Sequence, residues 1–452
     1  MATATRLEAL AGRQLSLEEP FDIAQVRETR LSRLLMIYIT TGLLFMLLPG
    51  TFLGVWNLIA ISKHHAATFV SAGWMQAHGH AQIFGWIGTF VLGIGFYSIP
   101  KLRRMDRFAL WTAWTSWGMW TLGVSLRWLA GSYQWHWRQL LPFSALLELV
   151  AFLMFFLNVS GHRSEGTRPK CLEPWVVVVI AATLGLLATL LVNLGITIYL
   201  AVRGISPDLP QNLDQRFLIL QSWGFLVPFV WGFSAKWLPI FLGLRPLHAR
   251  LLLAAVAWNC AGVVTASAGR VEWGVRFLAL GITFAIWALR LLEPGEHSAK
   301  TKGVHSSFPF FIRLSYAWAG IAATLSLWAA ATTNSHGVWG ASRHALTVGF
   351  LATMVFCIGQ RVLPAFSGMR LLFSTKLMFV SLLLLNSGCA LRVSSEILAY
   401  QGFADGAWTW LPISAATEMS AVTLFAANLF LTFVSRPPSE CRVSRGREIT
   451  TT

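Results

Sequence analysis

The chain has 452 residues, of which 55% are hydrophobic and only 12% are charged. A soluble domain carries about 25% charged residues, so this composition excludes an ordinary soluble protein and predicts an all-α protein embedded in the lipid bilayer. The net charge of +16 does not indicate a nucleic-acid partner, because the basic residues are sorted by loop in the way typical of membrane proteins.

Twelve apolar segments are long enough to cross a bilayer, which takes about 20 residues each. We therefore expect one membrane domain over residues 34–434, a cytoplasmic N-terminal segment over 1–33 and a cytoplasmic tail over 435–452. An even number of spans places both termini on one side. The predicted spans lie near 34–60, 76–99, 108–130, 140–159, 174–201, 217–242, 251–268, 275–292, 310–333, 344–366, 372–398 and 411–434.

Lysine and arginine are concentrated in the even-numbered connections, and the odd ones hold few. Cytoplasmic loops of membrane proteins carry such an excess, so we expect a bacterial inner-membrane protein with its even loops and both termini in the cytoplasm. The basic residues of the even connections are Lys101, Arg103, Arg104, Arg107, Arg163, Arg168, Lys170, Arg245, Arg250, Lys300, Lys302, Arg313, Arg370 and Lys376.

One spacing of glycine, valine and proline occurs three times along the chain. It predicts three four-helix units over about 34–160, 174–292 and 310–434, related by pseudo-threefold symmetry, rather than the two halves of a transporter. The first and third units also share a later stretch that contains Glu148 and Glu418. The repeated positions are Gly85, Val91 and Pro100, then Gly224, Val230 and Pro239, then Gly349, Val355 and Pro364.

Histidine stands five residues before that glycine in two of the three units, as His80 and His344, whereas the middle unit has Ile219. Haem iron takes axial ligands from opposite faces, and two imidazoles at equivalent heights on related helices can supply them. His78 lies about 200° from His80 around an ideal helix. We therefore give His78 a different role, as a candidate copper ligand with His64, His65 or His136.

Charged residues inside the bilayer are costly and point to function. Glu148 and Glu418 occupy matched positions, and Arg392 can pair with Glu396 four residues later. These groups are candidates for proton relay, for binding a haem propionate or for a structural bond between helices. Arg343, next to His344, is a candidate partner of a propionate. Lys236 and Arg361 lie at cytoplasmic helix ends, where long side chains reach the interface.

These residues resemble a known family. The segment HGHAQIFGWIGTFVLGIGFYSIP at 78–100 is similar to the helix-two motif of the NnrS family and, more distantly, to the low-spin haem helix of haem-copper oxidase subunit I. RHALTVGFLATMVFCIGQRVLP at 343–364 and LRV at 391–393 also resemble NnrS. GFSAKWLPIF at 232–241 does so with Lys236 in place of arginine, and RLSYAW at 313–318 with Arg313 in place of histidine.

The resemblance implies a twelve-helix inner-membrane protein of the nitric oxide response with the architecture of haem-copper oxidases. It implies haem b held by His80 and His344, with copper as a second candidate metal and nitric oxide as a candidate ligand. Predicted helices six and seven carry no histidine, whereas the binuclear centre of an oxidase needs several there. Oxygen or nitric oxide reduction at such a centre is therefore not expected.

Two alternatives stay open at this stage. One is a divergent cytochrome oxidase subunit I-like protein that works with a redox partner, and the other is a transporter or copper-handling protein. Catalytic residues, the electron donor and the use of quinol are not identified by any motif.

Overall fold

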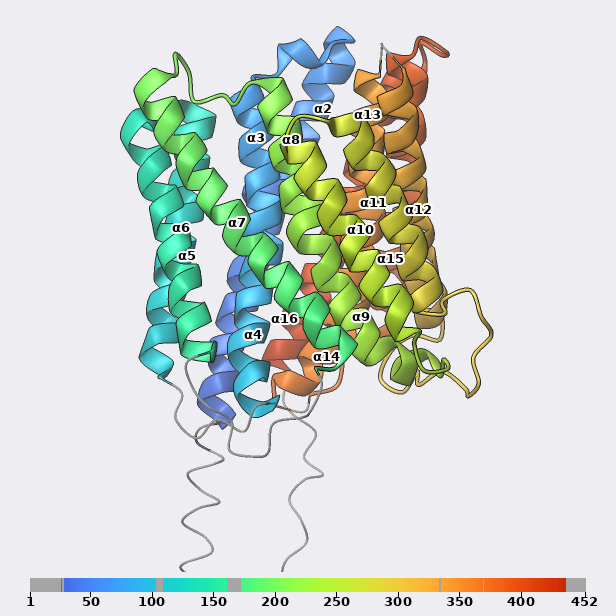
Figure 1. Cartoon of the computed structure of the whole chain (residues 1–452). Helices are drawn as coiled ribbons and strands as arrows, with labels where there is room; N and C mark the ends of the chain where they lie inside the picture. The colour runs from blue at the N-terminus through green and yellow to red at the C-terminus, as the bar shows by residue number, and fades with distance from the viewer. Residues whose placement is uncertain are drawn as a thin grey trace, which may run out of the picture.

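The computed structural model describes residues 26, 28–102, 109–160, 172–332, 335–368 and 370–435. Within these residues the chain forms twelve continuous helices and no strand (Figure 1). Most of the N-terminal segment 1–33 and nearly all of the tail 435–452 lie outside the described residues. The described chain begins and ends at the same end of the bundle (Figure 1), as an even number of crossings requires.

The twelve helices follow the predicted spans and extend beyond most of them. Several are built of more than one segment. In chain order they are residues Glu28–His64, with η1 (Met46–Phe52) and α2 (Leu53–His64); α3 (Ala72–His80), η3 (Ala81–Gly88) and α4 (Thr89–Leu102); α5 (Leu110–Tyr133); α6 (Trp137–Ser160); α7 (Pro174–Arg203); α8 (Gln211–Ile219), η4 (Leu220–Leu226) and α9 (Val227–Leu242); α10 (Ala249–Ser267); α11 (Val271–Ala288); α12 (Phe308–Ala331); α13 (His336–His344), η5 (Ala345–Ala352) and α14 (Thr353–Phe366); α15 (Thr375–Tyr400); and α16 (Ala407–Val434).

Eleven of these helices are long and apolar enough to cross a membrane. The remaining helix, α5, has 24 residues, which is ample for a crossing, but it carries five tryptophans among them. Tryptophan prefers the membrane interface to the hydrocarbon, so it contributes little to a hydropathy average. Because α5 packs along α6 after a short turn, it completes the set of twelve.

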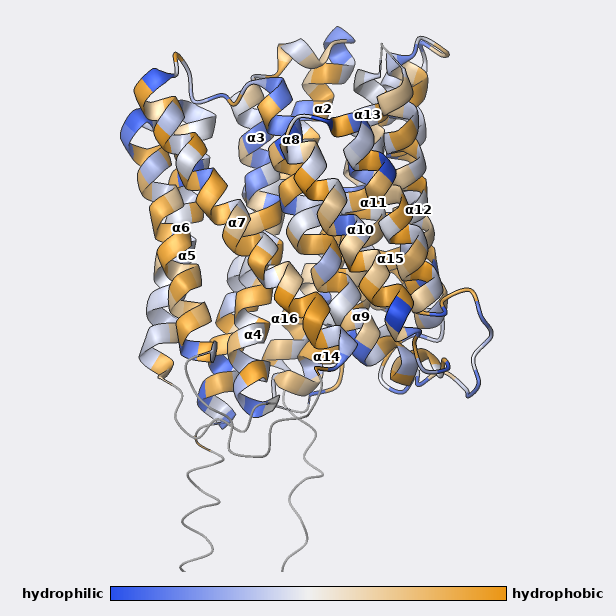
Figure 2. Cartoon of the chain, viewed as in Figure 1, coloured by the Kyte–Doolittle hydropathy of each residue, from blue (hydrophilic) through white to orange (hydrophobic). Residues whose placement is uncertain are grey.

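Apolar residues cover most of the outward faces of the helices, whereas hydrophilic residues gather mainly toward the two ends of the bundle (Figure 2). We call the end that carries residues 65–71 and 401–406 the far end, and the end that carries Ser435 the near end. With no water in the hydrocarbon, every backbone group must be bonded inside its own segment, which is why the spans are helical.

The three-unit repeat is visible in the backbone. Spans two, six and ten each contain a π-helical stretch, η3, η4 and η5, and each stretch begins directly after the repeat position occupied by His80, Ile219 or His344. Such stretches are rare and are frequent at functional sites. Their common place confirms three related four-helix arcs: arc one (spans one to four), arc two (five to eight) and arc three (nine to twelve).

Arcs one and three meet in the interior and at the rim. The α16 helix packs on η1 and α2 of the first span. Toward the near end, spans two and ten touch through Trp86 and Phe356, with ring centroids 6.2 Å apart, and through Tyr97 and Phe366, 4.7 Å apart. These contacts place the helices that carry His80 and His344 side by side.

Candidate functional site

His80 is buried at the end of α3 and is held by a carboxylate from α6. Its Nε2 lies 2.7 Å from Glu148 Oε1, and its ring stacks on Phe84 at 4.4 Å. The second oxygen of Glu148, Oε2, accepts from Asn193 Nδ2 on α7 at 3.3 Å. Glu148 and Asn193 have no exposed surface, so this bond set is shielded from solvent.

Arg127 on α5 interacts with the same cluster and was not among the residues expected from the sequence. It is only 8% exposed and interacts electrostatically with Glu148 and with Asp214 of α8. Its position is four residues after Gly123, just as Arg392 is four residues after Gly388. This shared spacing is the sequence signal that relates Arg127 to Arg392. The repeat expected from the sequence related spans two and four to spans ten and twelve, and span three was not part of it.

His344 lies in the corresponding place in arc three with different partners. Its Nδ1 is 3.1 Å from Gly340 O and 3.5 Å from Glu396 Oε2, and its Nε2 is 3.5 Å from Arg392 Nε. The expected pair on α15 does form, with Arg392 Nη2 3.3 Å from Glu396 Oε2. Glu418 is half-buried beside this cluster, and its buried Oε1 has no hydrogen-bond partner among the described residues.

The ring nitrogens distinguish the two histidines of span two. His78 Nδ1 lies 2.7 Å from Gly50 O in η1. Since a carbonyl only accepts, that nitrogen carries the hydrogen, and the Nε2 of a neutral ring is left as a free donor atom for a metal. His344 Nδ1 bonds to Gly340 O in the same way, while its Nε2 faces Arg392 Nε at 3.5 Å. In His80, by contrast, it is Nε2 that the carboxylate of Glu148 engages.

His78 and His344 are also close enough to interact electrostatically with each other, and both do so with Arg392. His78 packs into the space left by Gly54, where an added Cβ would come within 2.8 Å of the imidazole Cε1. The structure therefore brings His78, Arg392 and His344 together at the junction of arcs one and three. Among the described residues, His80 instead bonds toward the interior of arc one.

Arg343 is exposed at the far end and connects the two clusters by charge. It interacts electrostatically with Asp214 and with Glu396. Asp214 in turn interacts with Arg127. A series of charged side chains thus runs from the far end into both arcs.

At the far end, His64 and His65 stack on aromatic rings. His64 stacks on Phe69 at 3.7 Å and His65 on Trp408 at 5.1 Å. Within the described residues no three histidine, cysteine, aspartate or glutamate side chains are placed to hold a metal ion. The expectation that His78 binds copper with His64, His65 or His136 therefore finds no assembled ligand set.

Lys236 and Arg361 lie at the near end, away from these clusters. Lys236 Nζ is 3.2 Å from Glu173 Oε2, and the Trp175 indole also donates to this carboxylate. These two hydrogen bonds, that of Trp175 first, lower the pKa of Glu173 below its usual value. Arg361 lies over Phe241, 4.2 Å from the ring centroid, a cation–π contact.

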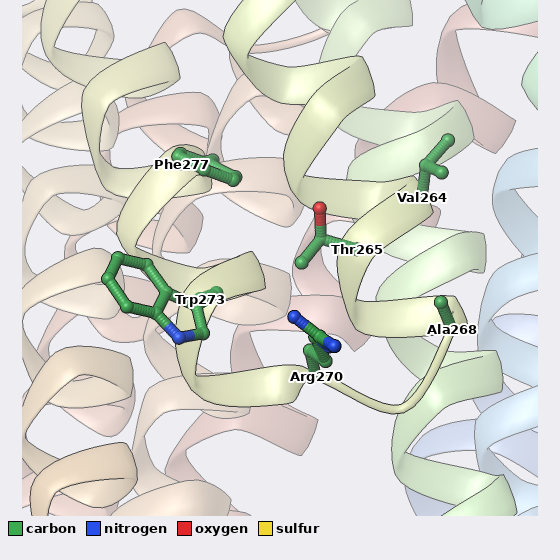
Figure 3. Close-up of a pocket in the computed structure, with 6 residues that line it drawn as sticks. All are labelled: Val264, Thr265, Ala268, Arg270, Trp273 and Phe277. Carbon is green, nitrogen blue, oxygen red and sulfur yellow. The ribbon is translucent and has the colours of Figure 1, made fainter.

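A separate open groove lies at the far end of the α10–α11 hairpin, with a volume of about 430 Å³. Figure 3 shows Arg270 at the turn, with Trp273 and Phe277 on one helix and Val264, Thr265 and Ala268 on the other. The groove lies on arc two, and none of its lining residues belongs to the clusters of arcs one and three.

Residues 238–434 match a domain of unknown function, DUF8744, and no curated protein matches the chain. Among solved structures, the fold is similar to a chain of a haem-copper terminal oxidase dimer determined by electron cryo-microscopy. The TM-score is 0.65 at 11% identity, over 89% of this chain and 84% of that chain.

At that identity the likeness concerns the fold alone. The chain has a haem-copper-oxidase-like fold. This confirms the architecture expected from the threefold repeat, while the resemblance to NnrS stays an expectation from the sequence motifs.

Proposed function

We propose that this membrane protein binds haem b between its second and tenth spans. On the NnrS resemblance, we further propose that it serves the response to nitric oxide or transfers electrons in the bacterial inner membrane. The observation that carries the proposal is the pair of imidazoles, His78 and His344, that lie within electrostatic range of each other and of Arg392 at the junction of arcs one and three. Each donates its Nδ1 hydrogen to a backbone carbonyl, so Nε2 is the ring nitrogen that can bind a metal.

This donor set fits a haem iron. A metal-binding histidine usually donates its second ring N–H to a carbonyl or carboxylate, which sets the tautomer and the ring orientation. Gly50 O and Gly340 O do this for His78 and His344. Arg392 Nε approaches His344 Nε2 only at 3.5 Å, the long limit of a hydrogen bond, so little is lost when that nitrogen binds a metal.

The repeat in the sequence predicts that His80, rather than His78, binds haem together with His344. In the structure His80 Nε2 is engaged by Glu148 at 2.7 Å, and binding iron through that atom would break a buried charge-assisted bond. We therefore propose that His78 and His344 would hold the haem iron. His80 is then the buried partner of Glu148, and Arg343, exposed beside His344, is the candidate partner of a propionate.

A haem held by two imidazoles supplies one-electron transfer. A haem held by two histidines would have no open position, so His78 and His344 together would favour electron transfer, and binding of nitric oxide would require one of them to move away. Catalysis at a haem-copper binuclear centre is not part of the proposal, because α8, η4, α9 and α10 contain no histidine. Copper remains a second candidate metal without an assembled site.

The test is the reduced-minus-oxidised absorption spectrum of the protein purified in detergent with haem supplied, together with its haem content. We expect a low-spin b-type spectrum that is lost in His344→Ala and in His78→Ala. His80→Ala should keep the spectrum, although its bands are expected to shift. His64→Ala is the matched control, because His64 lies at the far end and bonds within its own helix through Ala60 O.

Each result has a definite meaning. Loss in His80→Ala and His344→Ala, with His78→Ala unaffected, would restore the pairing expected from the repeat. A wild-type protein that stays colourless with haem present would overturn the proposed function. A transporter or copper-handling protein with this fold would then be the better interpretation.

A further inference from the structure

The three arcs contain the same small packing site, which allows them to be compared residue by residue. In each arc the third and fourth helices touch at a glycine. A Cβ added at Gly123, Gly262 or Gly388 would meet the side chain at one position of the following helix, Glu148, Leu278 or Glu418, within 2.7–2.9 Å. It would also approach the carbonyl four residues earlier in that helix, Ser144, Gly274 or Ser414 respectively.

The same three positions therefore define an equivalent site in each arc: the residue before the π-helical stretch, the residue four after the glycine, and the residue that faces the glycine. Their occupants are His80, Arg127 and Glu148 in arc one, Ile219, Ala266 and Leu278 in arc two, and His344, Arg392 and Glu418 in arc three. All three positions are ionisable in arcs one and three, and all three are hydrocarbon in arc two.

Arc two shows that the architecture does not need the charges. It forms the same helix pair and the same π-helical stretch around isoleucine, alanine and leucine. A buried ion pair is often no more stabilising than apolar residues of similar volume, and charges within the bilayer are expensive. Stability of the arc therefore does not explain the charges, and we infer that they interact with a further polar group.

The unpartnered atoms identify the chemical class of that group. Arg127 and Arg392, 8% and 6% exposed, each keep a buried Nη1 without an acceptor. Two acceptors beside these arginines lack a donor: Asn193 Oδ1, from α7 but bonded to Glu148 of arc one, and Glu418 Oε1 in arc three. The missing group in each cluster must both accept and donate, and an internal water molecule does both.

We propose that arcs one and three each enclose ordered water at these clusters and that arc two is dry at its matched site. In arc two Asn259 Oδ1 is also unpartnered, but one acceptor does not supply the two to four polar partners that an internal water needs. Arg343, exposed at the far end, interacts electrostatically with Glu396 of arc three and with Asp214, which in turn interacts with Arg127 of arc one. The waters thus provide a polar route from the far end toward His78, His80 and His344.

Radiolytic hydroxyl labelling in isotope-labelled water tests this without reference to haem. Radicals formed from enclosed water mark the side chains beside it. Phe84, stacked on His80, and Trp223 occupy the same place four residues after the repeat position in arcs one and two, and both are buried. Cys389 lies within electrostatic range of Glu418 and reports on arc three.

After correction for intrinsic reactivity, we expect Phe84 and Cys389 to be labelled several-fold faster than Trp223. Equal rates at Phe84 and Trp223, or no labelling at Phe84, would overturn the proposal. The indole of Trp223 reacts faster than the phenyl ring of Phe84, so a low yield at Trp223 cannot come from chemistry alone.

The chain offers its own replacement set for a second test. In the triple variant His80→Ile, Arg127→Ala, Glu148→Leu, arc one takes the residues of arc two. We expect it to fold, to melt no lower than the wild type, and to lose labelling at Phe84 down to the rate of Trp223, while Cys389 in arc three is unchanged. Retained labelling at Phe84 in the folded variant would contradict the proposal. If the triple variant fails, Arg127→Ala with Glu148→Leu alone repeats the measurement.

Discussion

At the scale of single residues, Glu148 uses both of its carboxylate oxygens in buried hydrogen bonds. One oxygen takes a hydrogen bond from His80 and the other from Asn193, and Arg127 supplies the opposite charge. The carboxylate has no exposed surface. Its partners lie on α3, α7 and α5, so this one residue joins three helices to α6.

Removing Glu148 alone is therefore expected to be costly. Glu148→Leu leaves His80 and Asn193 without their acceptor and leaves Arg127 with Asp214 as its remaining acidic partner. Removing one side of a buried charge pair costs about 3–5 kcal/mol. Arg127→Ala together with Glu148→Leu removes both charges and should recover most of that loss. Unfolding free energies in detergent for the wild type, both single variants and the double variant measure the coupling. Additive losses would show that the two charges do not compensate each other.

At the scale of elements, α7 and η4 approach each other closely enough that their backbones are in contact. A Cβ added at Gly185 would come within 1.8 Å of the backbone carbonyl of Gly224. Small residues let membrane helices approach in this way. Because Gly224 is the repeat glycine of arc two, the contact positions the π-helical stretch that corresponds to η3 and η5.

We expect Gly185→Ala to destabilise the protein by about 3 kcal/mol, because backbone cannot move aside as a side chain can. Gly195→Ala is the matched control on the same helix, since an added Cβ there meets nothing within 4 Å. The control should be neutral or slightly stabilising, because alanine favours helix more than glycine does. The melting temperatures of both variants in detergent measure this difference. Equal melting temperatures would contradict the close contact between Gly185 and Gly224.

At the scale of the whole molecule, the arrangement of charge predicts orientation in the membrane. The near end carries the basic even-numbered connections that the structure describes, such as those with Arg245 and Arg370, and the chain also ends there. Positively charged loops stay in the cytoplasm. We propose that the near end is cytoplasmic and that the site at the far end opens toward the opposite side.

Reporter fusions test this orientation. A green fluorescent protein joined after residue 435 should fluoresce, because it folds in the cytoplasm. Alkaline phosphatase inserted in the α15–α16 turn at residues 401–406 should be active, because it needs export. The reverse pattern would invert the molecule in the membrane and place the histidine site toward the cytoplasm.

The sequence by itself determined the class of the protein, the number of spans and the threefold repeat. Hydropathy and the spacing of glycine and proline are local properties, and a bilayer allows few ways to satisfy the backbone of an apolar segment. The equivalence of His80 with His344, and of Glu148 with Glu418, followed from the same spacing. The structure places both pairs at matching points of arcs one and three.

Only the tertiary structure decided which side chains face one another. His78 and His80 differ by about 200° around an ideal helix, so the rotation of span two determines which of them faces arc three and which turns to Glu148. Arg127 joins Glu148 because α5 and α6 meet at Gly123. Such neighbours depend on how helices from distant parts of the chain pack, and no spacing within one segment records that packing.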